Sequence, residues 1–76
     1  MSWSKRRRAD PLRVAEASLL GARRRLADLS RPEFASRYTP EHLALERADA
    51  LDSIARNSER IRQLGGDPDA PRLEPQ

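Results

Sequence analysis

The chain has 76 residues, of which 37% are hydrophobic and 36% charged, and its formal net charge is +3. This length allows one small domain. It contains no Cys, which excludes a disulfide framework, a zinc knuckle and thiol chemistry. No apolar run is long enough to cross a membrane or to form the core of a signal peptide. We therefore expect no membrane partner and a cytoplasmic or virion-associated location.

Charge is distributed unevenly along the chain. Residues 1–31 carry nine basic and three acidic residues, whereas residues 32–76 carry six basic and nine acidic residues. The first part is therefore net basic and the second net acidic. This asymmetry indicates that the two parts attract each other, or that the basic part faces an acidic partner such as nucleic acid.

Residues 1–9 form a basic arm that we expect to be flexible when free, because it has no hydrophobic periodicity and repels itself. Lys and Arg neutralise phosphates, and an indole can stack on a base or fill a pocket on a protein. The alternatives for this arm are a nucleic-acid contact, a contact with an acidic protein surface, and a solvated tail. The candidate contact residues are Trp3, Lys5, Arg6, Arg7, Arg8, Arg13, Arg23 and Arg24.

A first helix is predicted over residues 11–29. Asp10 is a favourable N-cap, and Pro11 suits the first helical position because its missing N–H would have no partner there. Apolar residues then recur at alternating intervals of three and four, which is the seam of a coiled coil. The members of this seam are Leu12, Ala15, Leu19, Ala22, Leu26 and Leu29.

The residues between the two long helices predict a corner. Ser30 precedes Glu33 by three positions, which is the spacing of a capping box, and Pro32 lies in the first turn. A short helical turn is therefore expected over residues 31–37. The first helix must end before it, because the residue that precedes a proline resists helical geometry.

A second helix is predicted over residues 40–64, with Thr39 as N-cap and Pro40 at the first position. Its seam is Leu43, Arg47, Ala50, Ile54, Asn57, Ile61 and Leu64. A second row lies beside this seam, so the apolar stripe is broad. The members of the second row are Ala44, Ala48, Leu51, Ala55 and Ser58. Gly65 and Gly66 supply the stop signal, and residues 65–76 are expected to be a flexible tail.

Two seams joined by a short corner predict an all-α fold, an antiparallel two-helix hairpin that resembles a coiled coil and spans residues 10–64. The expected helix–helix interface consists of Leu12, Leu19, Leu26, Leu29, Leu43, Leu51, Ile54, Ile61 and Leu64. In this register Arg25 and Glu46 should meet near the corner. Asn57 either fixes the register or is a polar site near a fraying end. The second helix should extend about two turns beyond the first, so that Ile61 and Leu64 protrude.

The sequence offers little for catalysis. His42 is the single histidine, and a lone His without Cys or a second His one turn away does not form a metal site. No Ser lies in a nucleophile elbow, and Gly65-Gly66 does not lead into a phosphate-binding helix. We expect no catalytic, cofactor or metal residues, no small-molecule substrate and no enzymatic activity.

The expected function is association. The chain has few large apolar residues with which to form a core. We therefore expect that it needs copies of itself or a partner to be firmly folded. The first hypothesis is an assembly or adaptor protein, either a homo-oligomer or part of a larger protein assembly. It would dock on a larger complex, for example a phage particle, through its helical seam and through the basic arm with Trp3. The alternatives are a nucleic-acid-binding accessory or regulatory protein and a small inhibitor of a host enzyme.

Overall fold

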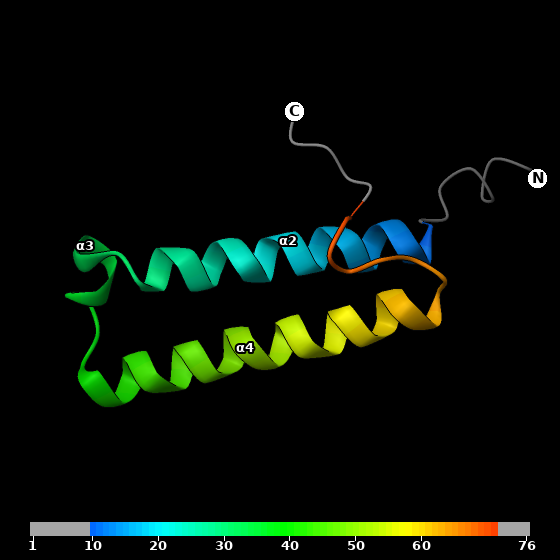
Figure 1. Cartoon of the computed structure of the whole chain (residues 1–76). Helices are drawn as coiled ribbons and strands as arrows, with labels where there is room; N and C mark the ends of the chain where they lie inside the picture. Colours follow the sequence, from blue (N-terminus) through cyan, green and yellow to red (C-terminus); the bar gives the residue numbers. More distant parts are fainter. Residues whose placement is uncertain (1–9, 72–76) are drawn as a thin grey trace, which may run out of the picture.

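The computed structural model describes residues 10–71, which contain three helices and no strand. These helices are α2 (Pro11–Leu29), α3 (Pro32–Ala35) and α4 (Pro40–Gln63). The long helices α2 and α4 lie side by side in opposite directions, and α3 forms the corner between them (Figure 1). The expected all-α hairpin is therefore confirmed.

Both long helices begin at the predicted caps. The Asp10 carboxylate accepts a hydrogen bond from the backbone N–H of Leu12 at 3.0 Å. The Thr39 hydroxyl accepts one from the N–H of His42 at 3.1 Å. In each case a proline follows the cap at the first helical position, so the caps and the prolines together set where the helices start.

The predicted capping box at Ser30 is wrong. Ser30 has αR backbone geometry and ends α2, and its hydroxyl donates to the Leu26 carbonyl at 3.2 Å. The N-cap of α3 is Arg31, which is extended and makes no side-chain cap bond. Arg31 takes this geometry because it precedes Pro32, and a residue before proline is disfavoured in the helical region.

Small and aliphatic side chains form the core along the contact of α2 with α4. Ala15, Leu19 and Ile61 are buried together, with Leu12 and Ile54 packed against them. Nearer the corner, the buried residues are Ala22, Leu29 and Ala50. Four residues of the seam predicted for α2 are therefore buried here, namely Ala15, Leu19, Ala22 and Leu29.

The seam of α4 departs from the prediction at its two polar members. Arg47 is exposed, because a guanidinium at the edge of the packed face reaches water easily. Asn57 is half-buried, but its amide donates to the Ser53 carbonyl at 2.9 Å and to the Ser53 hydroxyl at 3.2 Å, both within α4. Asn57 thus makes no hydrogen bond to α2 in the part of the chain that the structure describes.

Residues 65–71, which we call the strap, turn back from the end of α4 and reach α2 (Figure 1). Gly65 has a positive φ of 86°, and the N–H of Gly66 donates to the Ile61 carbonyl at 2.8 Å. This is a Schellman helix end, which requires a residue that tolerates left-handed geometry. Pro68 is buried, and its carbonyl accepts a hydrogen bond from Arg23 Nη2 at 3.0 Å.

The strap changes two expectations about the open end of the hairpin. Ile61 does not protrude: its side chain is fully buried, in contact range of Leu12 and covered by Gly66. The extra length of α4 lies at the corner, so its last turns stand opposite the first turns of α2 (Figure 1). Within the segment expected to be a flexible tail, residues 65–71 have a defined path because Gly66 and Pro68 pack on the helices.

Candidate interaction surfaces

An apolar row on α4 lies outside the contact with α2. We call it the outer row, and it consists of Ala44, Ala48, Leu51 and Ala55, all exposed. Leu51 retains 53% of its accessible surface, and the neighbouring Leu45 retains 70%. A single exposed Leu is ordinary on a protein surface, whereas a row at helical spacing is a candidate contact surface.

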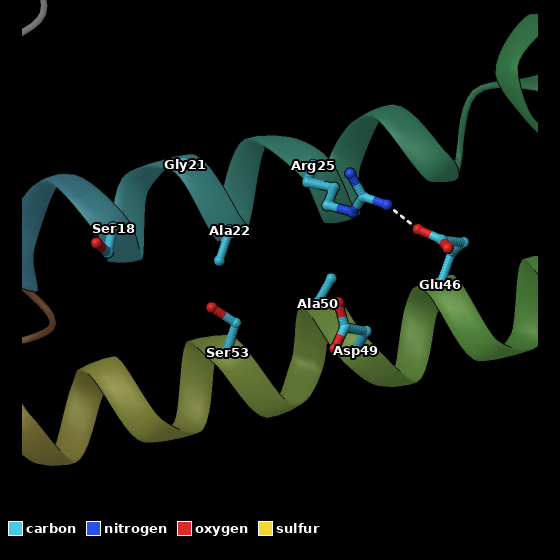
Figure 2. Close-up of a pocket in the computed structure, with 8 residues that line it drawn as sticks. All are labelled: Ser18, Gly21, Ala22, Arg25, Glu46, Asp49, Ala50 and Ser53. Atoms are coloured by element: carbon cyan, nitrogen blue, oxygen red, sulfur yellow. Dashed lines mark ion pairs between the residues drawn. The ribbon is translucent and has the colours of Figure 1, made fainter.

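The opposite side of the hairpin carries an open groove between α2 and α4, shown in Figure 2. Ala22 and Ala50 point towards each other at its floor (Figure 2). Their small side chains leave room that larger residues would fill. Charged residues of both helices line the groove near the corner, so it is polar at that end. The lining residues are Ser18, Gly21, Ala22, Arg25, Glu46, Asp49, Ala50 and Ser53.

Glu46 is the electrostatic centre of this groove. Arg25 Nη2 forms an ion pair with Glu46 Oε1, so the predicted meeting of these two residues is confirmed (Figure 2). His42 Nε2 lies 3.3 Å from the other carboxylate oxygen, one turn earlier on α4. The pair joins the two helices and, being partly exposed, acts on alignment more than on stability.

The basic residues predicted on α2 divide into two kinds. Arg13 and Arg24 are exposed and share one side of the helix, because eleven residues amount to just over three full turns. Within residues 10–71, neither forms an ion pair. Arg23 is half-buried and instead binds the strap carbonyl, so the structure gives it a role within the fold.

At the corner, two guanidinium groups lie within cation–π distance of the Phe34 ring. The Cζ atoms of Arg31 and Arg37 are 5.8 Å and 5.2 Å from its centroid. Arg31 is also paired with Glu33 at 3.0 Å. Glu33 partly neutralises this group of basic side chains. We therefore interpret the contacts of Phe34 with Arg31 and Arg37 as stabilising the corner.

The predicted interface residues fall into three groups of exposure. Leu19, Leu29 and Ile61 are buried. Leu12, Leu26, Leu43 and Ile54 are half-buried. Leu51 on α4 and Leu64 at its C-cap are exposed, and they retain 53% and 37% of their accessible surface. The predicted arm residues Trp3, Lys5, Arg6, Arg7 and Arg8 lie outside the residues that the structure describes.

The sequence interpretation did not anticipate two residues. Glu16 is only 1% exposed although its side chain is polar. Its position beside Leu12 and Leu19 in the helical pattern is the signal that could have indicated this burial. Pro68 lies in the segment that the sequence predicts to be a tail, and nothing in its local composition distinguishes it from the prolines around it.

Among residues 10–71, no cluster of three His, Asp or Glu side chains is arranged to hold a metal ion. No helix in this part of the chain combines the length and the apolar character needed to cross a membrane. In comparisons with known proteins, no family model, no curated protein and no solved structure matches the chain.

Proposed function

We propose that the chain is a non-enzymatic assembly or adaptor protein that docks on a larger protein complex through α4. The observation that carries this proposal is the outer row, which leaves Leu51 half exposed on a helix whose other face is packed. When such a row packs against a partner helix, each Å² of apolar surface removed from water stabilises the complex by about 25 cal/mol of free energy. The row presents four apolar residues at the spacing that a partner helix matches.

Site-specific photo-crosslinking in the cells that make the protein tests this proposal. A photoreactive amino acid at Ala48 should form discrete protein adducts, identified by mass spectrometry. The same group at Arg60 is the control, because Arg60 is exposed on a different side of α4. Adducts from position 48 alone support the proposal. Equal adducts from both positions, or none from either, contradict it.

One observation favours a second candidate, a nucleic-acid-binding accessory protein. Arg13 and Arg24 are exposed on one side of α2, and no ion pair in residues 10–71 neutralises them. With the basic arm they could make four to seven phosphate contacts, so log K should fall against log salt with a slope of about −4 to −6. A binding titration with duplex DNA and RNA at increasing salt measures this slope. Binding that is absent at low salt contradicts this candidate.

A further inference from the structure

We propose that the outer row of α4 pairs with the same row of a second copy, with the two α4 helices parallel. This inference rests on the proposed function, because it names the partner of the same surface. It is argued from the spacing of the row, from the charges on its two flanks and from what α2 presents to solvent.

The row has the geometry of a coiled-coil seam. Its members follow one another at intervals of four, three and four residues, which places Ala44 and Leu51 at d positions and Ala48 and Ala55 at a positions. All four lie within about 60° of one another around the helix. They extend over about 17 Å of α4. A second helix with the same seam would therefore meet them layer by layer.

The flanks of the row are complementary to each other. In a parallel pair, each g residue faces the e residue five positions later in the partner helix. The g positions here are Pro40, Arg47 and Ile54, and the e positions are Leu45, Asp52 and Glu59. Arg47 then faces Asp52 of the second copy, whose carboxylate also pairs with Arg56 of its own helix at 2.9 Å. Pro40 faces Leu45, and Ile54 faces Glu59, of the second copy. Each contact occurs twice in the dimer, and no like charges meet on these flanks.

The same charges disfavour the antiparallel arrangement. Antiparallel helices place e positions against e positions, which brings the acidic flank of one copy, with Asp52 and Glu59, against the acidic flank of the other. The only basic g residue, Arg47, would face the basic flank of its copy. Arg47 is exposed and forms no ion pair within residues 10–71, so it is available to an acidic partner.

The other long helix offers no matching row. Val14 and Leu20 are its exposed large apolar residues, and six residues of separation place them about 120° apart around α2. Arg23 on that helix is held by the strap. An α4–α4 contact is therefore the arrangement in which the two apolar rows meet and Arg47 faces an acid.

The pairing should be reversible. Glu41 and Arg62 continue the seam beyond its two ends, and in a parallel dimer each would face its own copy. These like charges confine the contact to residues 44–58. Stable dimers bury about 800 Å² per partner, which a short row with one Leu does not reach. We expect a dissociation constant on the order of 100 µM.

Sedimentation equilibrium of the full chain between 10 µM and 1 mM, at low salt, tests the pairing. Arg47→Glu and Asp52→Arg should each weaken association about tenfold, because two attractive contacts become repulsive. An equimolar mixture of the two variants should recover wild-type association, since both contacts in the mixed dimer again join opposite charges. The double variant R47E/D52R should recover it as well.

Two controls keep the result specific. Arg60→Glu makes the same charge change on a different side of α4 and should leave the dissociation constant unchanged. Arg62→Leu should strengthen association severalfold by extending the seam, whereas Arg60→Leu should not. Circular dichroism of each variant confirms that the helices are intact. Recovery in the mixture excludes misfolding as the cause of weakening.

The outcomes separate this inference from the proposed function. A chain that is monomeric up to 1 mM overturns the inference. The parallel register is overturned if Arg47→Glu leaves the dissociation constant of the dimer unchanged, or if the mixture of the two variants does not recover association. If the chain is monomeric but the photoreactive group at position 48 still captures another protein selectively, the inference fails and the proposed function stands. If position 48 captures nothing and the chain is monomeric, both fail.

Discussion

Arg25 of α2 and Glu46 of α4 form an ion pair that joins the two long helices next to the corner. Glu46 is 24% exposed at its side chain, whereas Arg25 is 50% exposed. His42 Nε2 approaches the same carboxylate at 3.3 Å. The Glu46 carboxylate thus contacts a basic side chain from each of the two helices. The pair favours this register of the hairpin, because a shift of one turn would separate Glu46 from Arg25.

Replacing Glu46 with Gln should lower the free energy of unfolding by about 0.5–1 kcal/mol, since the pair is partly screened by solvent. Urea denaturation followed by circular dichroism measures this loss. The double variant R25Q/E46Q should lose less than the sum of the two single variants. Strict additivity of the single losses would show that the two side chains do not interact in solution.

Gly21→Ala should stabilise the chain by about 0.5–1 kcal/mol. Gly21 lies within α2, and a Cβ built there meets no atom within 4 Å. Alanine would therefore reduce the conformational entropy of the unfolded chain without a clash. Thermal denaturation should show a raised midpoint. A lowered midpoint would mean that another molecule, or residues outside 10–71, approaches this position closely.

Gly66→Ala should have the opposite effect and destabilise the chain by about 1–2 kcal/mol. A Cβ at Gly66 would lie 2.8 Å from Leu12 Cδ1 and 3.0 Å from Ile61 Cγ2. The strap or the Leu12 side chain would have to move. Gly21→Ala is the matched control, because it makes the same chemical change in open space. Equal effects of the two substitutions would contradict the packing of the strap.

Deleting residues 67–76 should destabilise the hairpin by about 1.5–3 kcal/mol, because the deletion removes Pro68 and loosens the cover of Ile61. It also leaves Arg23 without its acceptor, the Pro68 carbonyl. Deleting only residues 72–76 is the control, since it retains every contact of the strap described above. Urea denaturation and binding of an apolar dye measure the two deletions. Equal stability of both truncated chains would show that the strap contributes nothing.

Local signals predicted the helices well. Asp10 with Pro11 and Thr39 with Pro40 mark the helix starts because their effects act within one turn. The α2 seam and the Arg25–Glu46 contact followed from helical periodicity and from the rule that g positions meet in antiparallel pairs. The capping box at Ser30 failed because two local rules compete there, and the restriction imposed by Pro32 on Arg31 prevailed.

The candidate surface could be predicted only in part. The sequence shows that α4 has two apolar rows, the seam and the row beside it, but the sequence alone does not decide which of them packs against α2. The structure packs the seam with Ala50 and Ile61 and leaves the row with Leu51 exposed. This choice depends on how both helices fit along their whole length, which no local window contains.

The sequence by itself determined that this chain is a helical hairpin with a basic first part and an acidic second part, because caps, prolines and heptad spacing act over a few residues. Only the tertiary structure decided which face of α4 stays open and how its far end is covered. The burial of Ile61 requires Leu12, which is distant in sequence and meets Ile61 and Gly66 only after the hairpin has closed. Contacts of that kind depend on closing the whole loop between them, so they appear only in the folded chain.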